Sequence, residues 1–506
     1  MPGPGAVPGR IARVLTPEQI RDLAATFTGH DYTFDAVVGL IGEPAHRALG
    51  RNSTVAAVRE IGDRDDPLAT LTRLWPLQQP VARAALDRAL PGLVGPLTDA
   101  GILNLTDQTV RAVVDIRPYA SDSGPGRNWW VASDPTPGLD QPSGPMRPDF
   151  VLGVSSASST LAQLTIRTPV GRALDLGTGC GVQSLHLTAH ADQVTATDLN
   201  PRALILARLT ADLNGVEVDF RLGDLYEPVA GVRFDLITSN PPYVMSPPSA
   251  DRLVYREGTT AGDGLVEQVV RQGASQLADG GVLQVLGNWA HLHDVSWSDR
   301  WMDWLTGLGC DAHIVQREVL DPFEYVELWL ADAGLSGSPA YRDRYAEWLD
   351  YFAQLGIDAV GLGWVTLRKT GARNPETIIE DWPFGVEQPI APALTAELAA
   401  IDRLRGLDDQ QRLRRHWRLA DDVTEETQGE PGAADPQHIV LRQHRGFRRA
   451  MTVDTELAAI LGACDGELSL AQIVESVARL LGTDPDALRD RTLGRLAEVI
   501  VQGYLQ

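Results

Sequence analysis

Residues 174–181 read LDLGTGCG, and this stretch decides the fold that we expect. The apolar residues before Gly177 are typical of a buried strand, and the apolar-periodic residues after Gly181 are typical of a helix. Glycines at 177, 179 and 181 permit a tight turn between the two elements and let a ligand approach the backbone. A glycine-rich turn is weak evidence by itself, so its meaning depends on the segments around it.

Strands and helices alternate on the C-terminal side of this turn. The expected strands are residues 172–177, 193–199, 217–224, 234–240, 281–288, 312–320 and 359–371, and the expected helices are residues 182–190, 201–215, 264–280 and 301–309. A mainly helical insertion at residues 321–358 precedes the last strand. This alternation predicts a mostly parallel, doubly wound α/β sheet, which binds its ligand at the carboxyl ends of its strands.

Two carboxylates follow the second and third expected strands. Asp198 lies 17 residues beyond Gly181, where a carboxylate can accept hydrogen bonds from both hydroxyls of a ribose. Asp224 ends the third strand and precedes Leu225, at the place where an adenine amino group and ring edge would lie. Together with the GxGxG turn, this pattern resembles that of class I S-adenosylmethionine-dependent methyltransferases, over about residues 150–370.

The resemblance implies a seven-stranded Rossmann-like sheet and S-adenosyl-L-methionine as the cofactor. It places the three glycines of the turn at the methionine part of the cofactor, Asp198 at the ribose and Asp224 at the adenine. The cofactor-binding residues that we expect are Asp175, Gly177, Thr178, Gly179, Gly181, Asp198, Leu199, Asn200, Asp224, Leu225 and Asn240.

Residues 240–243, Asn-Pro-Pro-Tyr, follow the fourth expected strand. Proline cannot donate to a sheet, so the strand must stop here, and a simple proline turn is one interpretation. In the same family, the motif resembles the site of enzymes that methylate planar nitrogens. The resemblance implies that the Asn240 side-chain oxygen and the Pro241 carbonyl accept the two hydrogens of that nitrogen, while Tyr243 packs on its flat face. The expected catalytic residues are Asn240, Pro241, Pro242 and Tyr243.

Residues 255–265, YREGTTAGDGL, resemble the segment that follows this motif in glutamine methyltransferases of the release-factor type. We interpret Glu257 and Asp263 as residues that order the loop or cap the next helix. A protein glutamine amide is therefore the first choice of acceptor, followed by a base in RNA or DNA and then by a small-molecule amine or amide. The non-enzymatic alternative is a winged-helix regulator that senses the cofactor, although sensing needs no acceptor motif.

The N-terminal residues 1–148 precede the expected methyltransferase domain, which spans residues 149–371. The first expected helix of this part begins at Thr16, and further helices follow it. Two expected strands, at 108–119 and 127–134, come after the helices. Helices followed by a short hairpin favour a winged-helix-like α+β module. Such a module would dock or cover a substrate, or would bind DNA.

A second helical, winged-helix-like module is expected at residues 372–506. Its acidic residues 421–435 predict a solvated loop or ribbon tip. A basic region on the same module could meet RNA or an acidic protein, although interdomain ion pairs with the acidic residues 421–435 are the simpler account. The basic region consists of Arg412, Arg414, Arg415, Arg418, Arg442, Arg445, Arg448 and Arg449.

Several segments near the glycine turn allow two interpretations. Phe150 and the serine-rich residues 155–160 could form a lid over the cofactor or could simply begin a helix. Trp129 and Trp130 could stack on a base, but paired aromatic residues on a strand more often belong to a core. The insertion at 321–358 could be a lid or an interface, and the sequence does not determine the oligomeric state.

Composition restricts the chemistry and the expected location. The chain has 506 residues and a formal net charge of −23, from 67 acidic and 44 basic residues, so it repels phosphate backbones unless a local patch is basic. Cys180, Cys310 and Cys464 are far apart, and His291 and His293 have no cysteine nearby, so we expect neither disulfides nor a metal. A signal peptide and a membrane-spanning run are also not recognisable, so we expect a cytoplasmic protein without a membrane partner.

Overall fold

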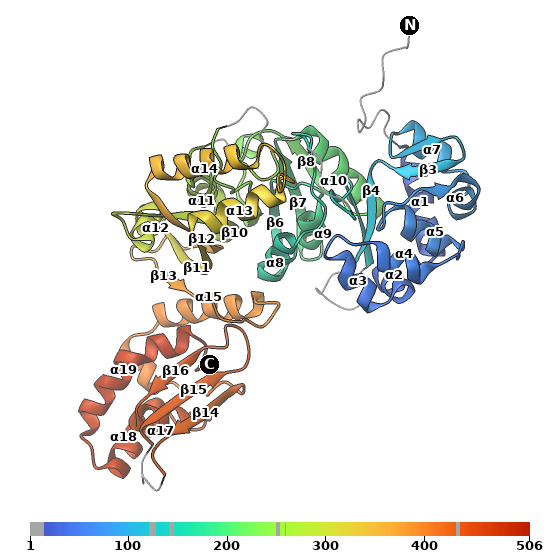
Figure 1. Ribbon diagram of the computed structural model, residues 1–506. Helices are drawn as coiled ribbons and strands as arrows, with labels where there is room; N and C mark the ends of the chain where they lie inside the picture. The colour runs from blue at the N-terminus through green and yellow to red at the C-terminus, as the bar shows by residue number, and fades with distance from the viewer. Residues whose placement is uncertain (1–14, 121–127, 141–145, 249–253, 259, 432–435) are drawn as a thin grey trace. The chain divides into compact units, whose positions relative to one another are not determined.

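The computed structural model describes residues 15–120, 128–140, 146–248, 254–258, 260–431 and 436–506. It divides into two compact units, of which the first contains residues 1–162 and 168–382 and the second contains residues 163–167 and 383–506. The first unit therefore contains both the predicted N-terminal module and the predicted methyltransferase sheet (Figure 1). The predicted domain boundaries after residues 148 and 371 stay predictions.

The first unit is built around a mixed sheet with strand order β13-β11-β12-β10-β9-β6-β7-β8. Strands β8, β7, β6, β9 and β10 run parallel to one another, whereas β12 is antiparallel to both β10 and β11. The strands are β6 (Val170–Leu176), β7 (Ala191–Asp198), β8 (Asp219–Leu222), β9 (Phe234–Ser239), β10 (Leu277–Leu292), β11 (Cys310–Leu320), β12 (Ile357–Lys369) and β13 (Thr377–Asp381). The predicted α/β architecture is confirmed.

The prediction of seven strands is wrong, because the sheet has eight strands within the described residues. The additional strand, β13, forms where the chain returns to the sheet after residue 371. Strand β13 runs parallel to β11, with Ala312 opposite Thr377 and Ile314 opposite Ile379. Ala312 N donates to Glu376 O at 2.8 Å just before the strand begins. A five-residue strand with only two apolar residues gives a weak sequence signal, which explains why it was not expected.

Helices connect the strands and cover the sheet. Those near the glycine turn are α8 (Ser156–Leu164), α9 (Val182–Leu187) and α10 (Pro201–Leu213), followed by the 3-10 helix η1 (Glu227–Val229), α11 (Gly264–Gln276) and α12 (Trp297–Leu305). The predicted insertion forms two helices, α13 (Pro322–Asp332) and α14 (Tyr341–Leu355). One core cluster joins Leu174 and Ile237 of the central strands to Val269 of α11 and Trp301 of α12. Burial of this apolar surface holds the layers together.

The N-terminal part of the first unit is mainly helical. Its elements are α1 (Pro17–Gly29), α2 (Phe34–Ile41), α3 (Glu43–Leu49), α4 (Val55–Ile61), α5 (Pro67–Leu74), β1 (Val81–Ala82), α6 (Arg83–Ala89), α7 (Val94–Asp99), β2 (Leu103–Thr106), β3 (Thr109–Ala112), β4 (Asp115–Ala120) and β5 (Asn128–Ser133). The single strand predicted at 108–119 is in fact two, because β3 pairs with β1 and β2 while β4 pairs with β5. The winged-helix interpretation stays a prediction.

Strand β5 packs this N-terminal part onto helix α10. Trp130 N donates to Asn214 Oδ1 at 3.0 Å, and Asn214 Nδ2 donates back to Trp130 O at 2.7 Å. Trp129 is 6% exposed and belongs to a core that also contains Leu206 and Leu209 of α10. The core interpretation of Trp129 is therefore confirmed, and its partner Trp130 packs against the same core.

The second unit combines helices with a three-stranded antiparallel sheet of order β14-β15-β16. Its elements are α15 (Ala391–Arg405), α16 (Asp409–Arg414), β14 (Val423–Gln428), β15 (His438–Gln443), β16 (Ala450–Val453), α17 (Thr455–Gly462), α18 (Leu470–Leu481) and α19 (Pro485–Val501). Part of the predicted acidic loop is thus a strand, and residues 432–435 lie outside the described residues. Arg442 pairs with Glu426 at 2.7 Å and Arg418 with Asp421 at 3.3 Å, so these two arginines do pair with the acidic residues, but within one unit and not between domains as predicted.

None of the helices in the described ranges is both long and apolar enough to cross a membrane.

Candidate active site

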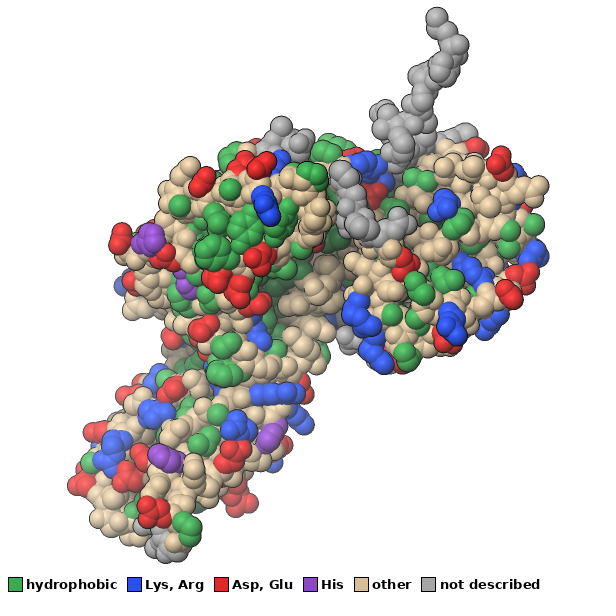
Figure 2. Space-filling model, viewed as in Figure 1, with side chains coloured by type: hydrophobic (Ala, Val, Ile, Leu, Met, Phe, Trp, Pro, Cys, Tyr) green, Lys and Arg blue, Asp and Glu red, His purple; other side chains and the backbone are tan. Residues whose placement is uncertain are grey.

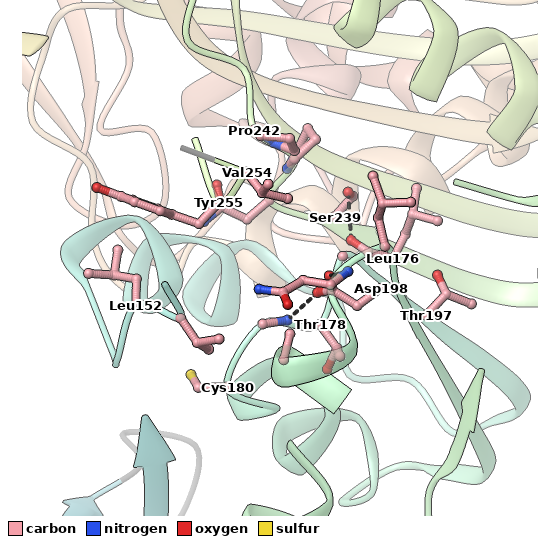
Figure 3. A pocket seen from close by; sticks show the side chains of 18 of the residues that line it. Leu152, Leu176, Thr178, Cys180, Thr197, Asp198, Ser239, Pro242, Val254 and Tyr255 are labelled. Carbon is pink, nitrogen blue, oxygen red and sulfur yellow. Dashed lines mark hydrogen bonds between the residues drawn. The ribbon is translucent and has the colours of Figure 1, made fainter. Parts of the chain in front are cut away.

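A cavity lies at the carboxyl ends of β6, β7, β8 and β9. Figure 3 shows Pro242, Val254 and Tyr255 on one side of it and Asp198, Thr178 and Cys180 on the other. The predicted residues that line it are Asp175, Gly177, Thr178, Gly179, Asp198, Leu199, Asn200, Asp224, Leu225, Asn240, Pro241 and Pro242. Two predicted residues, Gly181 and Tyr243, are not among the described residues of the lining.

The glycine turn follows β6 and presents its backbone to the cavity. Gly177 N and Thr178 N donate to Thr197 O, at 2.9 and 3.0 Å, which ties the turn to the end of β7. Gly177 and Gly179 have φ values of +75° and +55°, and a Cβ at either position would meet no described atom within 4 Å. The absence of side chains here leaves the space open for a ligand, as predicted for these two glycines.

Gly181 has a different role from the other two glycines. Its φ is +84°, and a Cβ there would lie 3.1 Å from the α carbon of Ala207 on α10. This glycine therefore lets helices α9 and α10 pack closely, and it is not among the described residues that line the cavity. Its predicted contact with the cofactor stays a prediction.

Asp175, at the end of β6, is buried beneath the turn. Its Oδ2 accepts hydrogen bonds from Thr178 Oγ1 at 2.6 Å and Ser184 Oγ at 2.7 Å. Burial raises the pKa of this carboxyl to about 6, although the two hydroxyl hydrogen bonds favour the charged form. In this position Asp175 orders the turn from below while also lining the cavity.

Asp198 ends β7 and faces the cavity with both carboxylate oxygens held by the backbone. Oδ2 accepts from Gly179 N at 2.9 Å and Oδ1 accepts from Asn200 N at 2.8 Å. Burial raises the pKa of Asp198. Each oxygen keeps a further lone pair, so the pair of oxygens can accept from the two hydroxyls of a ribose. Asn200 itself caps α10, because its Oδ1 accepts from Arg202 N at 3.0 Å.

The end of β8 supplies the third predicted contact. Gly223 N donates to Asp198 O at 3.1 Å, and Glu227 N donates to Asp224 O at 3.0 Å, so the turn after β8 is fixed to the neighbouring strand end. Leu225 has a φ of +43°, which turns its backbone sharply beside the cavity. Asp224 and Leu225 both line the cavity where the adenine is expected.

Asn240 directly follows β9 and carries an unsatisfied polar atom. Its Oδ1 is buried, and no described residue donates a hydrogen bond to it. Most buried side-chain oxygens in proteins have a partner, so this atom calls for an explanation. The Pro241 carbonyl beside it accepts one hydrogen bond, from Tyr243 N at 2.8 Å. Its second lone pair is available to a ligand.

Comparisons with known proteins agree with this geometry. Residues 153–293 match the family model of the methyltransferase small domain, and residues 29–113 match that of a domain of unknown function (DUF7059). The chain contains a class I S-adenosylmethionine-dependent methyltransferase domain.

Three relatives illustrate the extent of the match. The release factor glutamine methyltransferase of Deinococcus radiodurans is 52% identical over 83 residues, which are 16% of this chain and 28% of that protein. A protein of Methanocaldococcus jannaschii described as an N5-glutamine methyltransferase is 34% identical over 120 residues, 22% of this chain and 59% of that protein. The ribosomal RNA small subunit methyltransferase C of Sodalis glossinidius is 30% identical over 138 residues, which are 27% of this chain and 36% of that protein. The chain thus spans less than two thirds of the length of each relative.

Tyr243 of the methyltransferase domain lies away from the cavity. Its ring is 6.5 Å from that of Trp329 on α13 and packs against two apolar clusters. Burial raises the pKa of its hydroxyl. The predicted packing of Tyr243 on the flat face of the acceptor is therefore not present in this arrangement, because the ring has turned toward the insertion helices. Pro242, Val254 and Tyr255 form that wall of the cavity instead.

The segment after the Asn-Pro-Pro-Tyr motif contributes Glu257 to the cavity lining of the methyltransferase domain. Glu257 Oε1 accepts from Arg256 Nη2 at 3.0 Å, which orders this segment as predicted. Asp263 precedes α11 but does not cap it with its side chain. Its Oδ2 accepts from Ala290 N and from Arg300 Nη1, each at 2.7 Å, so it ties α11 to β10 and α12. Thr259 lies outside the described residues.

The segment before β6 supplies the opposite rim of the cavity. Phe150, Ser155 and Ser158 all line it, and Ser155 Oγ accepts from Ser158 N at 3.2 Å at the start of α8. The interpretation as a helix start is confirmed, because Ser155 accepts from the first turn of α8. The segment also borders the cavity, and the lid over the cofactor stays a prediction. Sequence reasoning missed Leu152, Cys180, Gln183, Val254, Tyr255 and Leu265 in the lining, since nothing in their residue types marks them.

The described part of the methyltransferase domain holds no assembled set of metal ligands. Among the described residues, no group of three or more His, Cys, Asp or Glu side chains could hold a metal ion. The two histidines considered above have other partners, since a ring nitrogen of His291 lies 2.7 Å from Gln316 Oε1 and His293 Nδ1 lies 2.6 Å from Asp358 Oδ2.

Proposed function

We propose that the chain transfers a methyl group from S-adenosylmethionine to a planar nitrogen, and that the acceptor is a glutamine side-chain amide of a protein. The observation that carries the proposal is the buried, unpartnered Oδ1 of Asn240 at the edge of the donor cavity. A buried oxygen without a partner costs about 1–3 kcal/mol, and a substrate N–H that fills it recovers this free energy on binding.

The chemistry of a planar nitrogen explains why two acceptors are needed. The lone pair of an amide nitrogen is delocalised, so the nitrogen is a poor nucleophile. Asn240 Oδ1 and the second lone pair of the Pro241 carbonyl accept its two hydrogens, which draws the nitrogen toward a tetrahedral shape and directs its lone pair at the donor. The cofactor supplies a methyl group on a sulfonium, which is a good leaving group. A strong general base is therefore unnecessary.

The choice of a protein acceptor has two supports. Residues 255–265 resemble the corresponding segment of release-factor-type glutamine methyltransferases, and relatives described as glutamine methyltransferases match this chain over part of their length. The net charge of −23 disfavours a phosphate backbone as a partner. The second candidate is an exocyclic amine of a nucleobase, which the partial match to ribosomal RNA methyltransferases favours.

The test is a labelling experiment with tritiated S-adenosylmethionine, the full chain and a cell extract. Aliquots are treated with protease or nuclease before the retained label is counted. We expect label that protease releases and nuclease does not, together with labelled N5-methylglutamine in an exhaustive enzymatic digest of the protein and labelled methylamine after its acid hydrolysis. Label that only nuclease releases would replace the first candidate by the second.

Asn240→Ala is the matching variant for the acceptor contact. It removes the oxygen that we assign to the substrate nitrogen, so turnover should fall by about 100-fold, as the loss of one preorganised hydrogen-bonding group typically does. Affinity for S-adenosylmethionine, measured by calorimetry, should stay near the wild-type value. Full turnover by this variant would show that the substrate nitrogen binds elsewhere.

A further inference from the structure

The loop after Asn240 is anchored beneath the two helices of the insertion. Val244 and Met245 are 3% and 1% exposed, and they share an apolar cluster with residues of both helices. The members of this cluster from the insertion are Tyr325, Val326 and Leu330 of α13 and Trp348 and Phe352 of α14. The acceptor loop thus depends for its packing on a segment that lies some 80 residues later in the sequence.

A hydrogen bond joins this loop directly to α13. Met245 N donates to the hydroxyl oxygen of Tyr325 at 3.0 Å, and the side-chain amide of Asn288 on β10 lies 2.7 Å from the same hydroxyl. Tyr325 is 0% exposed. Burial raises the pKa of its hydroxyl well above the usual value, so the group stays neutral and serves as a fixed hydrogen-bonding partner.

Arg256 makes a second connection between the acceptor side and α13. Val244 N donates to Arg256 O at 2.8 Å, so the two segments on this side of the cavity lie side by side. The Arg256 guanidinium is buried and its Nη1 donates to Trp329 O at 3.0 Å and to Asp332 Oδ2 at 2.8 Å. The neighbouring residue, Glu257, lines the cavity. Arg256 therefore connects a cavity wall to the end of α13.

Helix α14 contacts the far end of the segment at residues 255–265, which contains Arg256 and Glu257. Gly262 N donates to Tyr351 Oη at 2.9 Å, just before α11 begins. The opposite face of the helical pair is exposed, and Figure 2 shows hydrophobic side chains gathered over this part of the molecule. Phe323 and Leu328 of α13 are 56% and 47% exposed. The pair thus packs on the acceptor side with one face and meets solvent with the other.

We infer that Tyr325 is a positioning residue for methyl transfer, because its hydroxyl fixes the loop that carries Asn240 through the Met245 N–H. The helices α13 and α14 are then a part of the acceptor site. The inference rests on the proposed function, since it assigns a role relative to Asn240. Attack on a sulfonium methyl requires an aligned nitrogen, and a misplacement of about 1 Å can cost about 100-fold in rate, so a shift of the Asn240 loop lowers turnover without affecting the donor half of the cavity.

The experiment compares Tyr325→Phe with Tyr345→Phe, which removes the same hydroxyl from the same helical pair. The Tyr345 hydroxyl donates to Glu327 Oε1 on the exposed side, away from the loop. Turnover is measured as tritium transferred from S-adenosylmethionine into the protein fraction of a cell extract, and donor-site affinity is measured by calorimetry with S-adenosylhomocysteine. We expect Tyr325→Phe to lower turnover by roughly 10-fold with donor-site affinity and melting temperature near the wild-type values, and Tyr345→Phe to change none of the three.

A double-mutant cycle separates positioning from general stabilisation. If Tyr325 acts through the position of Asn240, then Tyr325→Phe added to Asn240→Ala should lower turnover by less than about 2-fold further. Asp332→Asn provides a variant outside the core that weakens the Arg256 connection, and it should lower turnover in the same direction by a smaller factor.

Three results would overturn the inference. They are wild-type turnover in Tyr325→Phe, a parallel loss of donor-site affinity or melting temperature, and fully additive effects in the double mutant. A failure of the proposed function gives a different result from a failure of this inference. In that case Asn240→Ala would keep wild-type turnover, or the wild-type chain would label no protein. If Tyr325→Phe does not fold, Asp332→Asn with unchanged turnover would overturn the inference.

Discussion

The two halves of the cavity are built in different ways. The donor half consists of short turns after β6, β7 and β8, which hydrogen-bond to one another through the backbone over residues 174–225. The acceptor half consists of the loop that begins at Asn240 and the segment around Glu257. The loop is held by the Tyr325 hydroxyl of α13, and Arg256 of the segment donates to the Trp329 carbonyl and the Asp332 carboxylate of α13. The donor half is thus local in sequence, whereas the acceptor half depends on an insertion. This difference suggests that donor binding and acceptor positioning can be altered separately.

The sharpest test of this separation is Asp198→Ala. Both carboxylate oxygens are placed to accept from the ribose, and charge-assisted hydrogen bonds contribute about 1.5–3 kcal/mol each, so affinity for S-adenosylmethionine should fall by at least about 100-fold. Calorimetry checks this result. Asp219→Ala is the control, because Asp219 lies at the exposed start of β8 and pairs with Arg221. Unchanged affinity in Asp198→Ala would remove the ribose assignment and, with it, the contrast with Asn240→Ala.

Two glycines of the same turn provide a finer test within the donor half. Gly179→Ala places a methyl group in the cavity, so it should lower donor affinity by about 10-fold while unfolding stability falls by only about 1 kcal/mol from the positive φ. Gly181→Ala brings a methyl group against Ala207, so it should lower the free energy of unfolding by about 1–3 kcal/mol, with a smaller effect on affinity. Urea unfolding and calorimetry measure the two quantities. The reverse pattern would mean that Gly181, and not Gly179, borders the ligand.

The smallest effect concerns the buried carboxyl of Asp175. Its pKa in the folded chain is about 6, above the value near 4 of an unfolded chain. Between pH 4 and 6 the folded state therefore holds a proton that the unfolded state has released, and stability contributed by this group falls as the pH rises through that window. Relative to Asp175→Asn, the wild-type melting temperature should decrease between pH 4 and 6 and then level off. A difference that is constant with pH would contradict the raised pKa.

The donor half could be predicted from the sequence because its signals are local. The glycine turn, Asp198 and Asp224 each follow an expected strand, and parallel strands bring their carboxyl ends to one edge. The position of Asn240 followed from the same rule. Sequence spacing could not distinguish Gly181 from Gly179, because the difference depends on the approach of α10.

The contacts that build the acceptor half could not be predicted from the sequence. Tyr243 belongs to the expected motif, but its ring turns toward Trp329, 86 residues later in the chain. Tyr325 lies in no recognised motif, and Arg256 lies in the 255–265 segment without a role that its residue type predicts. The contacts of both come from the packing of the insertion onto the acceptor side. The strands β3 and β4 were likewise merged in the prediction, since each alternates apolar and polar residues and only the pairing partners separate them.

Helix α10 joins the methyltransferase sheet to the N-terminal part, with a consequence for any attempt to shorten the chain. Arg202 at its start donates to both carboxylate oxygens of Asp134, and Asp134 also accepts from Val151 N at 2.8 Å. A fragment beginning at residue 149 would remove the Asp134 carboxylate that pairs with this guanidinium and would expose the apolar side of α10. The smallest self-sufficient catalyst should therefore retain the helices and strands that precede residue 134, and truncation here would yield an aggregating fragment rather than a minimal enzyme.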